Sequence, residues 1–168
     1  MLFSLYAPGG ASLASQEDYL QASFATNYIG LSGAGGIKAL DLDKMLAGKL
    51  ASASPFIAGS THGITGSAAP ADLETALQLL YLDFTAPGAD PDAFAVMKRQ
   101  LDAAVVNRGR SPGQVFGERV EAINTSNHFT AEPLTADKVA TLDPARMLAF
   151  YTQRFADRKS IRLNSSHV

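Results

Sequence analysis

The sequence has no cysteine among its 168 residues. It therefore has no disulfide, no thiolate ligand for zinc and no thiol nucleophile. Long apolar runs are missing as well, since no stretch approaches the roughly 18 consecutive apolar residues of a membrane-spanning helix. These absences exclude a disulfide-stapled scaffold, cysteine-based catalysis and a membrane span.

A strong charge of either sign is also lacking. The chain carries 14 Lys and Arg against 16 Asp and Glu, a formal net charge of -2. The basic residues are scattered, whereas a nucleic-acid-binding protein clusters them on one face. Nucleic acid is therefore not an expected partner. Hydrophobic residues make up 46% of the chain, enough for the packed core of one domain.

The remaining patterns predict a mixed structure. Short runs bounded by Gly and Pro predict strands at residues 2–6, 51–57 and 61–68, with the last two joined by Gly59 and Ser60. Helical spacing and capping residues predict helices over 18–29 and 40–48, followed by helices that begin at Pro70, Pro91, Pro112 and Pro144. The fold class is therefore α+β, an antiparallel sheet covered by helices.

Apolar stripes indicate which helix faces are expected to be buried. Leu73, Leu77, Leu80 and Phe84 recur at helical spacing, and we expect this helix to be mostly buried. The helix that begins at Pro112 carries its own stripe of Val115, Phe116, Val120 and Ile123.

The three histidines, His62, His128 and His167, do not form a metal-binding motif. None has a second His or a Glu three or four residues away, the spacing that places two ligands on one helix face. A structural or surface role is expected for each. Glu118 and Glu121 share one helical turn, a spacing that fits an ordinary solvated face better than an acid–base pair.

A glycine-rich segment, residues 33–36, invites comparison with phosphate-binding loops. It follows a predicted helix, however, whereas the dinucleotide fingerprint follows a strand and opens a helix. We therefore interpret it as a helix stop and a loop. Gly33, Gly35 and Gly36 are our candidate contacts for a bound peptide.

Several segments, in this order and at this spacing, resemble the bacterial pitrilysin/insulinase family of zinc metallopeptidases. The segments are Leu-Ala-Gly-Lys at 46–49, Gly-Ser at 66–67, Asp-Leu-Glu-Thr at 72–75, Leu-Gln-Leu-Leu-Tyr-Leu at 77–82, Phe-Thr-Ala-Pro at 84–87, Phe-Tyr at 150–151 and Arg-Phe-Ala-Asp at 154–157.

The resemblance implies a clamshell-type fold of homologous α+β domains, of which this chain is an incomplete one. In that family one domain carries His-x-x-Glu-His on a helix and a later Glu as third zinc ligand, and a sister domain lacks these ligands. Here the corresponding helix reads Gln-Ala-Ser-Phe-Ala-Thr-Asn at 21–27, and the later one, 93–106, has no Glu. The family's Asn-His-Pro appears as Asn127-His128-Phe129. The resemblance is therefore to the sister domain, and no catalytic or metal residue carries over.

The implied function is that of a non-catalytic part of a zinc-dependent peptidase. It would hold no cofactor itself, while zinc would belong to the parent enzyme. Its partners would be the catalytic half of that parent and a peptide substrate, and the family resemblance favours the bacterial periplasm or cell envelope. Two alternatives stay open: a structural scaffold subunit of the same fold, and an unrelated α+β binding module.

The resemblance covers residues 1–157 and stops before the last eleven residues. Residues 158–168 are polar and basic, without strand alternation or a helical stripe. We expect this tail to be foreign or disordered, to carry no function, and to leave one edge of the sheet unpaired.

Overall fold

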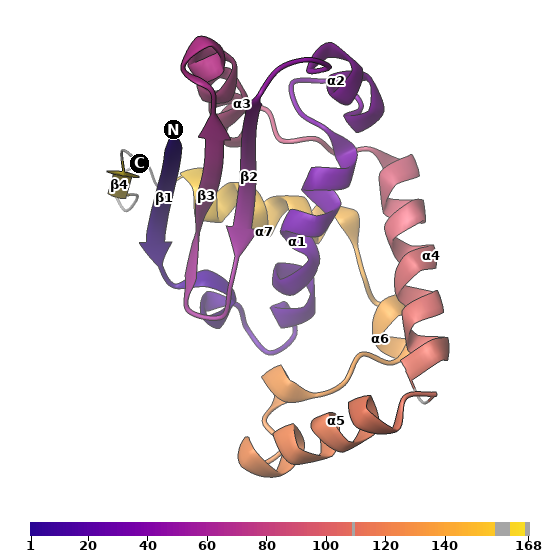
Figure 1. Ribbon diagram of the computed structural model, residues 1–168. Helices are drawn as coiled ribbons and strands as arrows, with labels where there is room; N and C mark the ends of the chain where they lie inside the picture. The colour runs from indigo at the N-terminus through magenta and orange to yellow at the C-terminus, as the bar shows by residue number, and fades with distance from the viewer. Residues whose placement is uncertain (109, 157–161, 167–168) are drawn as a thin grey trace.

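The computed structural model describes residues 1–108, 110–156 and 162–166. Its elements follow one another as β1 (Leu2–Pro8), α1 (Tyr19–Ser32), α2 (Ala39–Met45), β2 (Ala51–Ile57), β3 (Thr61–Ala68), α3 (Leu73–Thr85), α4 (Pro91–Arg108), α5 (Pro112–Asn124), α6 (Ala136–Ala140), α7 (Pro144–Ala156) and β4 (Arg162–Ser166). Figure 1 shows α1 and α7 behind one face of the sheet. The predicted α+β class is confirmed.

The sheet is antiparallel and its strands lie in the order β2-β3-β1-β4. The predicted hairpin of β2 and β3 has the predicted bounds, because Gly59 and Ser60 form the tight turn between them. The prediction of an unpaired edge beside β1 is wrong: the backbone of Arg162–Ser166 pairs with Leu2–Tyr6. The predicted foreign origin of the tail stays a prediction.

Side-chain caps explain where several helices begin. The Ser111 hydroxyl accepts a hydrogen bond from the Gln114 N–H at the start of α5, and Thr135 does the same for Lys138 at α6. The Asp143 carboxylate accepts from the Ala145 N–H. Each cap satisfies an N–H group that the first helical turn leaves unpaired, so these boundaries follow from the local sequence.

Helix α1 ends later than the sequence predicts. Gly30 remains helical, and the helix ends at Gly33, whose φ of 87° lies in the left-handed region. A Cβ at Gly33 would also come within 2.2 Å of the Ile37 carbonyl oxygen. The stop therefore requires glycine at position 33, whereas an exposed glycine at 30 only weakens a helix.

The core lies between the sheet and helices α1, α4 and α7. Its largest fully buried side chains include Tyr28, Met97, Tyr151 and Phe155. The rings of Tyr151 and Phe155 stack with centroids 4.3 Å apart. Burying one such side chain stabilises the fold by roughly 1.5–3 kcal/mol, so these contacts hold α7 and α1 against the sheet.

Helix α3 is less buried than its apolar stripe predicts. Leu77 is 49% exposed and Ala76 is the one fully buried residue of the helix, while Leu80 and Phe84 are partly buried against the core. The inner face of α3 therefore contains Leu80 and Phe84 of the predicted stripe, with Ala76 in the place of Leu77. The periodicity identified the helix correctly and misplaced one residue of its inner face, Leu77.

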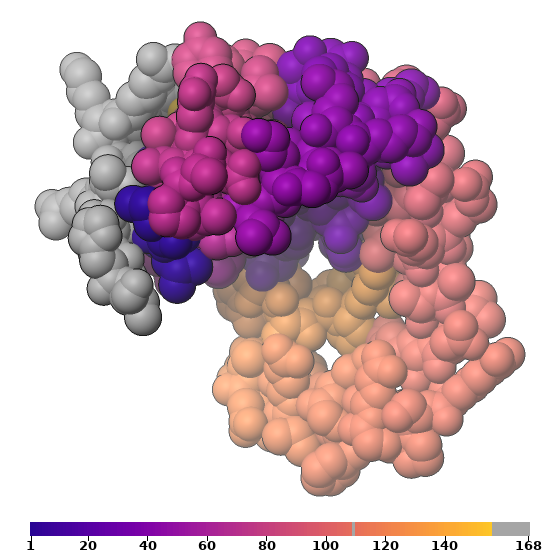
Figure 2. Space-filling view, turned by 45° about the horizontal axis from the view of Figure 1, so that its top comes forward, coloured from indigo at the N-terminus to yellow at the C-terminus, as the bar shows by residue number. Residues whose placement is uncertain are grey.

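Helix α5 exposes its apolar stripe. Phe116 and Ile123 are 71% and 66% exposed, and Val115 and Val120 are exposed as well. In the space-filling view (Figure 2) the segment around α5 stands away from the sheet and its covering helices. An ion pair ties it to α4: the Arg108 guanidinium donates to the Glu118 carboxylate, with Nη2 2.7 Å from Oε2.

Candidate functional site

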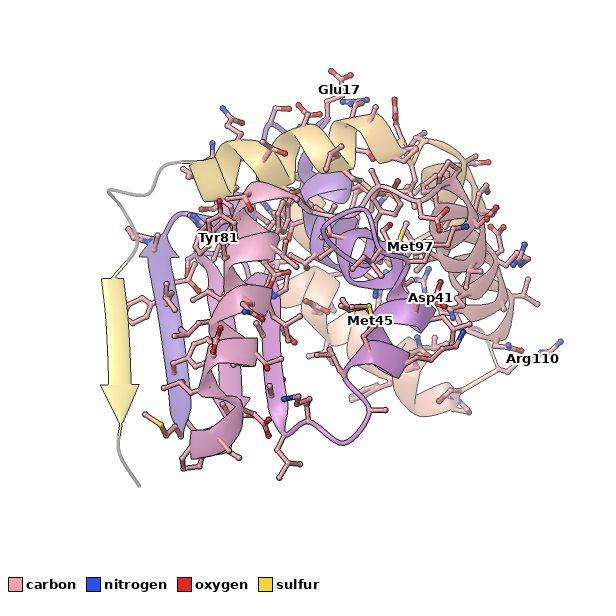
Figure 3. The ribbon with its side chains drawn as sticks, turned by 90° about the horizontal axis from the view of Figure 1, so that it is seen from above. Glu17, Asp41, Met45, Tyr81, Met97 and Arg110 are labelled. Atoms are coloured by element: carbon pink, nitrogen blue, oxygen red, sulfur yellow. The ribbon has the colours of Figure 1, made fainter. Side chains whose placement is uncertain are left out.

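A cavity of about 430 Å³ lies between α1, α2, β2 and α3. This volume is within the usual range of ligand-binding cavities, roughly 300–1,000 Å³. In the view from above (Figure 3), α2, marked by Asp41 and Met45, lies beyond the β2 side of the sheet. Residues 51–55 of β2 form one wall of the cavity, so it runs along the outer edge of that strand.

The backbone of β2 turns alternate residues toward this edge. Leu50 accepts a hydrogen bond from the Ala69 N–H and Ala58 donates to the Thr61 carbonyl oxygen. Because antiparallel neighbours bond through every second residue, Ala51, Ala53, Pro55 and Ile57 point their backbone groups away from β3. In the part of the chain that the structure describes, no strand pairs with that side.

Pro55 is one of these outward positions. Proline lacks an N–H, so inside a sheet it would remove a ladder bond, and it is confined to edges and bulges. Here its missing donor lies on the outer side of β2 and the pairing with β3 is intact from Ala51 to Ile57. Proline at position 55 is thus compatible with β2 as an edge strand of the sheet.

The three glycines predicted to contact a peptide differ in their position relative to the cavity. Gly33 lines the cavity, together with Gly30 and Ala34. Gly35 instead donates from its N–H to the Ala86 carbonyl oxygen at 2.8 Å, which ties the loop to the end of α3. Gly36 is not among the lining residues. Peptide contact by Gly33, Gly35 and Gly36 stays a prediction, and the geometry favours Gly33.

Asp83 is the lining residue that the sequence analysis missed. It lies on the inner face of α3, where its Oδ2 atom is fully buried and has no hydrogen-bond partner among the described residues. Burial raises the pKa of Asp83 to about 7, because a buried carboxylate loses its hydration. A lone charged residue in the apolar run at 79–84 was the signal for it.

His62 and His128 have structural roles. The buried His62 ring accepts from the Gly10 N–H at Nδ1, and its Nε2 lies 3.2 Å from the Arg154 carbonyl oxygen. These partners fit a neutral ring protonated on Nε2. Burial lowers the pKa of His62. His128 caps a short helical turn by accepting from the Thr130 N–H. His167 lies outside the described residues.

The helix in the place of the zinc motif does not fit a metal. Its buried polar residue, Gln21, donates to the Thr141 carbonyl oxygen at 2.9 Å and accepts from the Asp143 N–H at 3.0 Å. Gln21 thereby joins α1 to the start of α7. Within 1–108, 110–156 and 162–166, no three His, Cys, Asp or Glu residues group as metal ligands would.

Glu118 does not pair with Glu121. It binds Arg108 instead, and Arg108 also donates from Nη1 to the Leu134 carbonyl oxygen at 2.8 Å. Hydrogen bonding to Arg108 lowers the pKa of Glu118. The carboxylate is therefore part of a partly buried ion pair that positions α5, and not of the solvated face that the spacing predicts.

Solved structures of peptidases share this architecture. The periplasmic protease PqqL from Escherichia coli superposes with a TM-score of 0.80 at 17% identity, over 96% of this chain and 18% of that one. A peptidase M16 inactive domain from Pseudomonas fluorescens superposes with a TM-score of 0.71 at 19% identity, over 89% of this chain and 37% of that one. The chain has the fold of a pitrilysin-type peptidase domain.

Sequence comparison agrees with this assignment. A zinc protease PQQL-like protein of Arabidopsis thaliana is 27% identical over 158 residues, which is 94% of this chain. The chain spans only 14% of the length of that relative. No family model matches the sequence. The predicted resemblance to pitrilysin-type peptidases is confirmed, and the chain is related to a part of such a peptidase. Among the described residues, none of the helices has the length and apolar character to cross a membrane.

Proposed function

We propose that this chain is a non-catalytic domain of a zinc-dependent peptidase and that it holds an extended segment of the peptide substrate on the outer edge of β2. The supporting observation is the cavity along that edge, next to backbone groups of Ala51 and Ala53 that no described residue engages. Extended peptides bind exposed sheet edges by adding a strand, with main-chain hydrogen bonds supplying affinity.

The zinc belongs, in this proposal, to another part of the parent protein. The helix that would carry the motif uses Gln21 for a structural contact, and α4 has no Glu in the place of the later ligand. The proposed partner is the catalytic half of the same parent. The exposed stripe of α5, which includes Phe116 and Ile123, is a surface that this half would cover, since large exposed apolar patches mark interaction sites.

The proposed location is the bacterial periplasm or cell envelope, and the E. coli protease named above is periplasmic. Residues 158–168 have no part in the proposed function, which is assigned to residues 1–157.

Replacing Ala53 by proline tests the proposal. Proline removes the outward N–H of Ala53 and leaves the bonds between β2 and β3 in place. We expect a fluorescein-labelled extended heptapeptide to bind the 168-residue chain and to bind A53P at least tenfold more weakly in fluorescence anisotropy. Ala53→Ser, which keeps the N–H, is the matched control and should bind normally. Equal affinity of A53P and the original chain would refute binding at this edge.

A further inference from the structure

The charged residues that line the cavity beside β2 are all acidic. Of its lining residues only Asp43, on α2, and Asp83, on α3, are charged, and both are acidic. The other lining side chains are apolar or carry hydroxyl groups, among them Leu79, Ile29 and Ser54. A ligand group that enters this cavity therefore meets acidic groups and apolar walls together.

Asp83 differs from the aspartates that form ion pairs. Asp18 pairs with Arg146, Asp41 with Lys44, and Asp90 with Lys38. Asp83 has no ion-pair partner among the described residues, and its Oδ2 atom is buried. A buried carboxylate without a partner is costly for a folded chain, so its place in a cavity wall points to a ligand that completes it.

We propose that this cavity is a subsite for a basic side chain, Lys or Arg, of an extended peptide on the β2 edge, and that Asp83 supplies the pairing carboxylate. The inference rests on the proposed function, because the peptide backbone is held by β2. A lysine or arginine stem is apolar and its head is cationic, which matches walls of Leu79 and Ile29 around an acidic group. The carboxyl torsion of Asp is broad and turns at little cost, so Asp83 can direct its oxygens toward the guest.

Three matched heptapeptides test the subsite, alike except for a central Lys, norleucine or Glu. Against the 168-residue chain, anisotropy is expected to give the Lys peptide a Kd at least tenfold below that of the norleucine peptide, and the Glu peptide the weakest binding. Asp83→Asn should remove the difference between Lys and norleucine. Asp41→Asn makes the same chemical change outside the cavity and should preserve it. Circular dichroism of both variants checks that they are folded.

The possible failures are distinguishable. If Lys and norleucine peptides bind equally, and A53P weakens both, the β2 edge binds peptide and the basic subsite is refuted. A preference for Lys that survives D83N also refutes the role of Asp83. If no peptide binds the chain, both proposals fail. Self-association of the chain that D83N abolishes, measured by sedimentation equilibrium, would assign the subsite to a second copy and overturn the peptide assignment.

Discussion

Replacing Asp83 by asparagine should stabilise the protein at neutral pH. Burial raises the pKa of Asp83 from 3.8 to about 7, so between these values the folded chain binds a proton that the unfolded chain releases. The free energy of unfolding therefore falls as pH rises through this window, the opposite of the usual behaviour of a paired carboxylate. At about 1.36 kcal/mol per pKa unit, a shift of roughly three units lowers the free energy of unfolding by about 4 kcal/mol once the pH is above 7.

The measurement is the difference in unfolding free energy between D83N and the original chain. Asparagine does not titrate, so this difference should grow by about 2–3 kcal/mol between pH 5 and pH 8. Urea titrations followed by circular dichroism suit a chain without tryptophan. Asp41→Asn, in the exposed pair with Lys44, should change the stability by less than about 0.5 kcal/mol at each pH. A difference between D83N and the original chain that does not depend on pH would refute the argument.

Four further outcomes are expected. Gln21→Met removes both bonds between α1 and the start of α7 and should lower stability by about 1–3 kcal/mol in urea unfolding, whereas the exposed Gln78→Met should lower it by less than about 0.5 kcal/mol. Burial lowers the pKa of His62, so the unfolded chain binds a proton more readily at this ring than the folded chain does. The free energy of unfolding should therefore decline as pH falls below the ordinary histidine pKa of about 6.5. His62→Gln should flatten this decline in urea titrations and His128→Gln should not. Purified protein should hold far less than one zinc per chain in elemental analysis, and a stoichiometric, tightly held zinc would contradict our assignment. Deleting residues 158–168 should leave peptide affinity unchanged in anisotropy, since β4 and β2 lie at opposite edges of the sheet; a loss of affinity would show that the tail takes part.

Elements with local determinants were predictable from the sequence. The hairpin at 51–68 depends on its own turn, and α5 on a cap at Ser111 three residues from its partner N–H. The paired edge beside β1 was not predictable in this way, since it joins residues 156 to 164 positions apart in the chain.

The inner face of a helix depends on distant contacts. Leu77 and Leu80 have the same hydrophobicity, and only the packing of α3 on the sheet decides that Leu77 is the exposed one. The same reasoning applies to α5, whose stripe has no covering element in the described chain. The cavity, formed by four separate elements, could not be predicted from local spacing, although Asp83 in an apolar run was a usable signal.

Pro55 has a consequence for what can be added to β2. A guest strand meets donors at Ala53 and Ile57 and none between them, so one guest carbonyl remains hydrated. Shifting the register of the guest strand by two residues changes which of its carbonyl groups lies opposite Pro55. The proline therefore favours one register of the guest strand over others. Two copies paired edge to edge would each bring such a gap, which weakens the growth of a continuous sheet. Strand β2 can thus remain accessible to a guest peptide while it disfavours edge-to-edge association between copies of this chain.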